Sequence, residues 1–283
     1  MKWQGRRGSR NIERSRGGGG RAIGGIGGIG GVLILLIGWY FGVDVSQFVG
    51  TGGTSGTEQV DTGPIDAQDP QIDQFVSVVL ADTEDVWTAV FDSQVGEAYV
   101  PPTLRLFDGQ TQSACGGASA ATGPFYCPAD QKVYLDTAFF RTLQQQLGAG
   151  GDFAAAYVIA HEVGHHVQDE LGILGQVNNM RAQVDEAQSN ALSVRVELQA
   201  DCFSGIWARG AESMFGTLEP GDIDEAMNAA SRIGDDTLQR NAGQRVSPDS
   251  FTHGTSDQRQ RWFIRGYDSG DLTTCDTFSA TQL

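Results

Sequence analysis

One short run in the sequence has the residue types and spacing of a metal-dependent hydrolase. His161 and His165 are separated by four positions, with Glu162 directly after the first histidine. On an α-helix, side chains four apart project from one face, so both imidazoles can reach a single Zn²⁺. Glu162 is rotated by about 100°, where its carboxylate can take a proton from an activated water. The run predicts a zinc site with Glu162 as general base; surface histidines on an amphipathic helix are the alternative.

A catalytic zinc ion is usually held by three protein ligands, with one position left open. Glu197 and Asp201 are the best candidates for completing the site, because they are also four apart and share one helix face. Glu197 can bind the metal, and Asp201 can accept the outer N–H of a ligand histidine and so fix its tautomer. The alternative is a solvated helix face. His166 cannot reach the metal of its neighbour, and we expect a hydrogen-bonded or surface histidine.

Three segments together resemble the bacterial putative neutral zinc metallopeptidase family, a gluzincin-type family. They are AHEVGHHVQ at 160–168, ELQADC at 197–202 and HGTSDQR at 253–259. The resemblance covers residues 71–283, and residues 1–10 more loosely. It implies a zincin-like fold, one Zn²⁺ per chain and hydrolysis of peptide bonds in peptides or unfolded proteins.

Related membrane-associated gluzincins carry a histidine followed six residues later by an arginine, as His253 and Arg259 are here. By this resemblance His253 would stabilise the oxyanion and Arg259 would brace the acidic side of the site. Gly254 stands where those relatives usually have proline. The alternative for His253 is a loop histidine just before a helix that begins at Thr255.

The predicted site needs two long helices, which we expect at 152–171 and 184–208. Apolar spacing predicts further helices at 72–90, 136–146, 222–233 and 255–265 and strands at Thr103–Phe107 and Lys132–Asp136. The expected class is therefore α+β with helices dominant. The strand at Lys132–Asp136 is a candidate edge strand that could pair with an extended substrate.

Four cysteines can form three different sets of two disulfides. Cys115 and Cys127 bracket a short loop that a disulfide can close easily, which leaves Cys202 to pair with Cys275. A free buried thiol or a metal ligand is the alternative for Cys202.

The N-terminal region predicts a membrane anchor. Residues 1–21 contain seven basic residues and one acidic residue, and residues 22–43 contain no charge. A helix of that length spans roughly 33 Å, enough to cross a bilayer. The basic flank places the N-terminus in the cytoplasm and the catalytic domain outside, in a single-pass protein of the cell membrane. A cleavable signal peptide is the alternative. Paired glycines in the span permit a weak homodimer.

This division gives four parts: a basic head at 1–21, a span at 22–43, a flexible linker at 44–70 and a metallopeptidase domain at 71–283. The whole chain has 283 residues and a net charge of −16. Because residues 1–21 carry +6, the remainder is strongly acidic and would repel nucleic acid. A non-catalytic, zinc-containing binding or scaffold protein of the cell envelope is the alternative to a peptidase.

Overall fold

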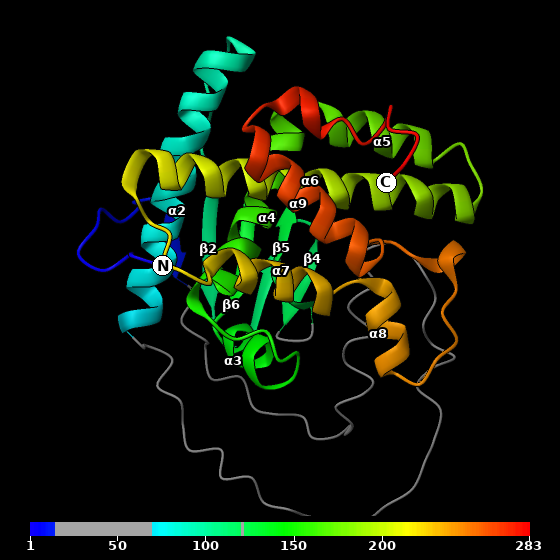
Figure 1. Cartoon of the computed structure of the whole chain (residues 1–283), viewed down its shortest axis with the longest axis horizontal. Coiled ribbons are helices and arrows are strands. Elements are labelled where there is room, and N and C mark those ends of the chain that lie inside the picture. The colour runs from blue at the N-terminus through cyan, green and yellow to red at the C-terminus, as the bar shows by residue number, and fades with distance from the viewer. Residues whose placement is uncertain (15–69, 120–121) are drawn as a thin grey trace, which may run out of the picture.

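The computed structural model describes residues 1–14, 70–119 and 122–283, and these form a helix-rich body with a small sheet (Figure 1). The predicted class, α+β with helices dominant, is confirmed. The helices are α2 (Pro70–Val90), α3 (Ala138–Gln145), α4 (Asp152–Glu170), α5 (Ile173–Arg181), α6 (Glu186–Phe215), α7 (Asp222–Arg232), α8 (Asp235–Asn241) and α9 (Ser256–Ser269). In the view of Figure 1, α6 and α9 cross the upper part of the body, and α2 stands at one side.

The main sheet has four strands in the order β1-β2-β6-β5. Its strands are β1 (Ile12–Arg14), β2 (Thr103–Phe107), β6 (Lys132–Asp136) and β5 (Phe125–Cys127); β3 (Gln110–Ser113) and β4 (Gly116–Ser119) form a separate antiparallel hairpin. β6 pairs with β2 in parallel and with β5 in antiparallel orientation. The expectation that Lys132–Asp136 is an edge strand is therefore wrong, because the three-residue strand β5 covers its outer side.

Small residues let the site helices approach closely. A Cβ atom on Gly164 of α4 would lie 3.1 Å from the carbonyl oxygen of Ala200 on α6. Gly205 of α6 and Gly266 of α9 lie against each other's helix so tightly that an added Cβ would overlap backbone atoms. Since α6 packs against both α4 and α9, these glycines fix three helix axes around one region. The predicted histidines and carboxylates lie at that crossing.

The site helices also begin at defined capping contacts. Gly151, with a positive φ of 116°, precedes α4 and leaves room for the Glu225 carboxylate, which accepts the N–H of Phe153 at 3.0 Å. Asp185 caps α6 by accepting the N–H of Gln188. Such caps satisfy the free N–H groups of a helix start.

Both predicted disulfides are confirmed. Cys115 pairs with Cys127, and Cys202 pairs with Cys275. The second bond links the middle of α6 to the segment after α9. Because Cys202 is bonded, the alternatives of a free thiol or a metal ligand at this position are excluded.

The N-terminal residues differ from the predicted division of the chain. Residues 1–14 pack against the body rather than forming a separate head: β1 extends the sheet in parallel beside β2, and Arg6 pairs with Asp82 of α2. The physical reason is charge complementarity between the basic N-terminus and acidic side chains of α2.

The predicted span at 22–43 lies outside the described residues, as do residues 44–69 of the predicted linker. Within the described part of the chain, no helix combines the length and the apolar character that a membrane crossing requires.

Candidate metal centre

Helices α4 and α6 bring the three predicted ligands together. His161 Nε2 lies 3.1 Å from Glu197 Oε2, and His165 Nε2 lies 3.5 Å from Glu197 Oε1. Ligand atoms bound tetrahedrally to zinc at the usual bond lengths are about 3.3 Å apart. The spacing therefore fits a single ion held by two imidazoles and one carboxylate, and one ligand atom from each residue lies within 4.8 Å of the others.

Burial strengthens the case for a metal at this position. Glu197 and His161 are each only 6% exposed, and buried ionisable groups are costly unless they are paired or bind a metal. Burial alone would raise the pKa of Glu197, but the neighbouring His165, His253 and His161 hold this pKa well below its usual range. The carboxylate is therefore kept ionised, as a metal ligand must be.

His161 is supported by a charged network. Its Nδ1–H donates to Asp201 Oδ1 at 2.8 Å, and the Arg259 guanidinium donates to both Asp201 oxygens at 2.8 and 2.9 Å. Tyr157 donates its hydroxyl to the same Asp201 oxygen at 2.5 Å. Burial lowers the pKa of His161, but Asp201 and Glu197 outweigh it and raise the pKa to about 10. This network turns the Nε2 atom of His161 toward Glu197.

His165 is supported by neutral amides. Its Nδ1–H donates to Gln168 Oε1 at 2.8 Å. The Gln168 amide nitrogen in turn donates to the carbonyl oxygen of Val196 at 2.8 Å and to Gln199 Oε1 at 3.0 Å. Gln168 is completely buried. Sequence reasoning missed this residue, although its position three after His165, one helical turn along, was the available signal.

Glu162 lies beside the ligands and is 8% exposed. Burial raises the pKa of Glu162, while the nearby His165 and His161 and a backbone hydrogen bond from Tyr126 of β5 act in the opposite direction. Edge strand β5 therefore contacts the predicted general base directly. A carboxylate with a raised pKa beside a metal site is suited to take up a proton and then release it.

His253 is held by Asp235, which sequence reasoning did not identify. Asp235 Oδ2 accepts the backbone N–H groups of Thr252, His253 and Gly254, at 2.8, 2.6 and 3.0 Å. The imidazole Nδ1 lies 3.3 Å from Asp235 Oδ1. Burial lowers the pKa of His253, but the charges of Glu197 and Asp235 raise it overall. This residue thus lies within the electrostatic field of the metal centre.

His166 faces away from the three ligands, as expected. It is 1% exposed, with Nε2 at 2.7 Å from the carbonyl oxygen of Val100 and Nδ1 at 3.1 Å from the hydroxyl of Tyr126. These contacts fasten α4 to β5 and to the chain before β2. On α4, His166 therefore makes packing and hydrogen-bond contacts on the side opposite the three candidate ligands.

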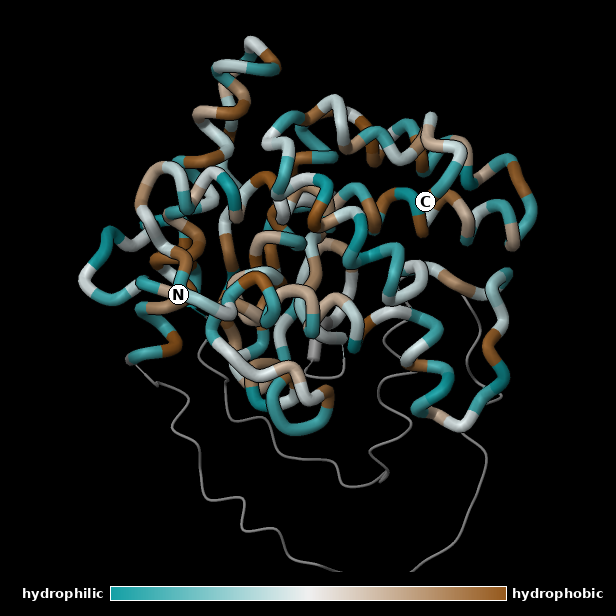
Figure 2. Tube along the Cα trace, in the orientation of Figure 1, coloured by the Kyte–Doolittle hydropathy of each residue, from teal (hydrophilic) through white to brown (hydrophobic). Residues whose placement is uncertain are grey.

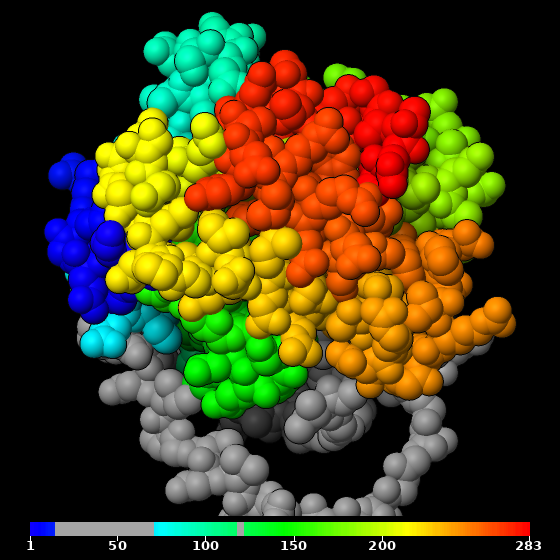
Figure 3. All heavy atoms as spheres, in the orientation of Figure 1, coloured from blue at the N-terminus to red at the C-terminus, as the bar shows by residue number. Residues whose placement is uncertain are grey.

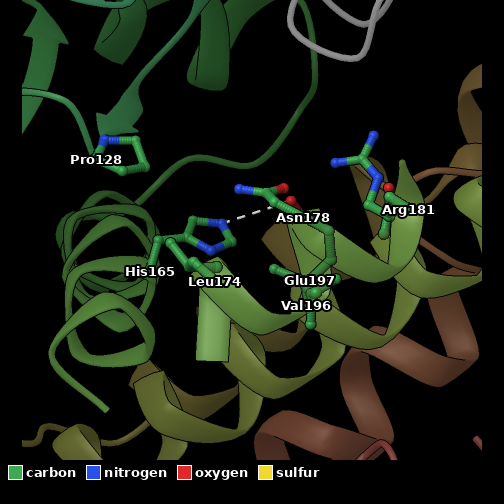
Figure 4. Close-up of a pocket in the computed structure, with 9 residues that line it drawn as sticks. Pro128, His165, Leu174, Asn178, Arg181, Val196 and Glu197 are labelled. Atoms are coloured by element: carbon green, nitrogen blue, oxygen red, sulfur yellow. Dashed lines mark ion pairs between the residues drawn. The ribbon is translucent and has the colours of Figure 1, made fainter. Parts of the chain in front are cut away.

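A pocket of about 60 Å³ opens beside His165 and Glu197. Figure 4 shows the His165 ring pointing from α4 toward Glu197 on α6, with Leu174 of α5 beside the ring and Asn178 and Arg181 of α5 farther along. The remaining lining residues are mainly apolar or uncharged, with one arginine: Pro128, Leu174, Val177, Asn178, Arg181, Ser193 and Val196. The pocket can receive a side chain adjacent to a group held at the metal.

Sequence comparisons give relatives and a family for this chain. The chain is 47% identical over 287 residues to "Uncharacterized protein YpfJ" of Escherichia coli strain K12, covering 98% of this chain and 99% of the relative. It is also 47% identical over 195 residues to "Uncharacterized protein Mb2605" of Mycobacterium bovis, covering 65% of each chain. No solved structure matches it significantly. Residues 1–278 match the family described as "Putative neutral zinc metallopeptidase", and the chain belongs to that family.

Proposed function

We propose that this protein is a zinc-dependent peptidase in which His161, His165 and Glu197 hold the metal and Glu162 is the general base. The observation that carries the proposal is the convergence of these three ligand atoms within 4.8 Å, with the buried Glu162 beside them. Bound Zn²⁺ would activate water and polarise a peptide carbonyl. The protein's own groups supply the remaining chemistry.

Glu162 would take a proton from the attacking water and pass it to the leaving amine. Its raised pKa favours this exchange because the protonated carboxyl is not strongly disfavoured. His253 is the candidate donor to the oxyanion: its pKa is raised, so the imidazole favours the protonated, hydrogen-bond-donating form. Arg259 and Asp201 would keep His161 in the ligating tautomer.

The pocket beside His165 supports a peptide substrate. Leu174, Val177 and Val196 give it apolar walls, which suit an aliphatic or aromatic side chain next to the scissile bond. Edge strand β5, which contacts Glu162 through Tyr126, is the strand with which an extended peptide could pair. Flexible peptides and unfolded proteins are the substrates that can adopt such an extended form.

We further propose that the protein is associated with the cell membrane through residues 22–43, as the charge-free run suggests. The two disulfides support a metal centre on the oxidising side of that membrane.

The test is a comparison of Glu162→Gln with wild type in the full chain. We expect one zinc per chain in both, measured by elemental mass spectrometry, and a fall in casein hydrolysis of at least about 100-fold in the variant. Glu170→Gln, at the end of the same helix, is the matched control and should retain activity. Equal hydrolysis by Glu162→Gln and wild type would remove Glu162 from the mechanism. Full zinc content without hydrolysis of any peptide library by the wild type would favour the scaffold alternative.

A further inference from the structure

Basic side chains of residues 1–14 pair with acidic side chains of α2. The Arg6 guanidinium donates two hydrogen bonds to Asp82 of α2, at 2.6 and 2.7 Å, and the Asp82 side chain is only 3% exposed. Arg7 pairs with Asp85 at 2.7 Å. Figure 3 shows the blue N-terminal residues packed directly against cyan α2 and the yellow end of α6. A two-point arginine–carboxylate contact of this kind is both strong and geometrically specific.

Apolar and backbone contacts extend the same interface. Trp3 packs edge-on against Phe75 of α2, with ring centroids 5.6 Å apart, and its Nε1–H donates to Asp152 Oδ2 at 3.1 Å. Asp152 is the first residue of α4, the helix that carries both ligand histidines. Further along, Ile12 lies opposite Leu104 in the parallel pairing of β1 with β2. The segment thus contacts a helix start, a helix face and a sheet edge.

Polar side chains fill the space between these contacts. Glu84 of α2 accepts hydrogen bonds from Ser9 and, at 2.9 Å, from Asn11, and the backbone N–H of Ser9 donates to the carbonyl oxygen of Ser77 at 2.9 Å. The N-terminal segment, blue in Figure 1, includes a loop at the edge of the body that is mostly hydrophilic in Figure 2. Side-chain and backbone hydrogen bonds thus join the segment to α2 along its length.

These contacts give the basic residues a role other than setting membrane orientation. Arg6, Arg7 and Arg14 are three of the seven basic residues before residue 22, and each is paired with an acid of α2. The cytoplasmic placement of the N-terminus was expected from those same charges. Their partners belong to the body that carries the metal centre, and a salt bridge requires both members on one side of a membrane.

We propose that residues 1–14 stay docked on α2, β2 and the start of α4 in the membrane-associated protein, so that residues 14 and 70 lie on the same side of the membrane. This replaces the expectation of a single-pass protein with a cytoplasmic head and an external domain. It also makes the N-terminal segment part of the support of α4, through Trp3 and Asp152. The proposal does not depend on catalysis, so it can fail while the proposed function stands.

A designed cross-link tests the docking. A Cβ atom on Gly8 would lie 3.3 Å from Ser77 Cβ, close to the separation found in disulfides. We expect Gly8→Cys/Ser77→Cys, made in the full chain and oxidised in intact cells, to form an intrachain disulfide that joins the two peptides in non-reducing mass spectrometry. Gly8→Cys/Ser93→Cys is the control. Residue 93 lies roughly 24 Å from residue 77 along the direction of α2, so this pair should form no intrachain disulfide. Failure of the first pair to cross-link, or cross-linking only between two chains, would overturn docking within one chain.

A second measurement tests sidedness without altering the packed interface. Gln4→Cys and Ser93→Cys place single thiols at exposed positions of the docked segment and of the body. We expect a membrane-impermeant maleimide to label both or neither in intact cells, and both after the cells are opened. Labelling of one and protection of the other would place the two regions on opposite sides and overturn the proposal.

Discussion

The two histidines of the candidate metal centre are held by opposite kinds of support. His161 donates to a carboxylate that is itself bound by Arg259, whereas His165 donates to the neutral amide of Gln168. A carboxylate raises the basicity of an imidazole ligand and stabilises its protonated form, whereas an amide mainly orients the ring. The comparison suggests a division of roles: one histidine is tuned by charge and the other is positioned by hydrogen bonds.

The largest effect is expected from Asp201→Asn. Removal of this charge leaves Arg259 buried at 2% exposure without its anionic partner, and breaking such a pair costs about 3–5 kcal/mol. His161 also loses its carboxylate acceptor, so the zinc affinity of the unprotonated site, corrected for the proton that zinc displaces from His161, should fall about 10- to 100-fold. Urea unfolding of the metal-free chain and competition titration with zinc measure the two effects. Asp257→Asn, an exposed change on α9, is the control, and unchanged zinc affinity in Asp201→Asn would contradict the charged role of this support.

Proton release on zinc binding should reveal the charged support of His161. The pKa of His161 in the metal-free protein is about 10, above its ordinary value of 6.5, so the imidazole is protonated at neutral pH and zinc must displace the proton. Because the folded pKa is raised, protonation stabilises the metal-free fold fully below pH 6.5, and this stabilisation is lost as the pH rises through 10. Zinc affinity should therefore rise about tenfold per pH unit between pH 7 and 9.

Calorimetry in two buffers of different ionisation enthalpy measures that proton. We expect about one proton released per zinc by wild type, and less by Asp201→Asn, in which the main cause of the raised pKa is gone. A pH-independent zinc affinity over this range would contradict the charged state assigned to His161.

The ligand set was predictable because it is encoded locally. Helical spacing places His161 with His165, and Glu197 with Asp201, on common faces before any tertiary contact is known. The supports of these residues depend on neighbours that one helix cannot reveal. Glutamine is usually a surface residue, so nothing in the sequence marks Gln168 as buried. Asp235 reaches His253 only because the chain folds back between α8 and α9.

Two of the parts of the fold that were not predicted show why local patterns are insufficient. The helix α5, sequence ILGQVNNMR, contains a glycine and two asparagines, which are poor helix formers; its contacts with α4 and α6 stabilise it instead. The docking of residues 1–14 was hidden because a cluster of arginines before an apolar run is also typical of membrane orientation signals. Asp82 and Asp85, the partners of Arg6 and Arg7, are three residues apart on α2. From the sequence alone, such a pair is expected on a solvent-exposed helix face.

The smallest effect is expected from Gln168→Leu, which tests the neutral side of the comparison. The substitution removes the acceptor of the His165 Nδ1–H and the donor to the Val196 carbonyl, so stability should fall by about 1–3 kcal/mol. Zinc affinity should weaken by about tenfold, less than in Asp201→Asn, and proton release should stay at the wild-type value because His161 keeps Asp201. Gln176→Leu, an exposed change on α5, controls for the added apolar surface. If Gln168→Leu abolished proton release, the two supports would be coupled, and the division between a tuned and a positioned histidine would have to be abandoned.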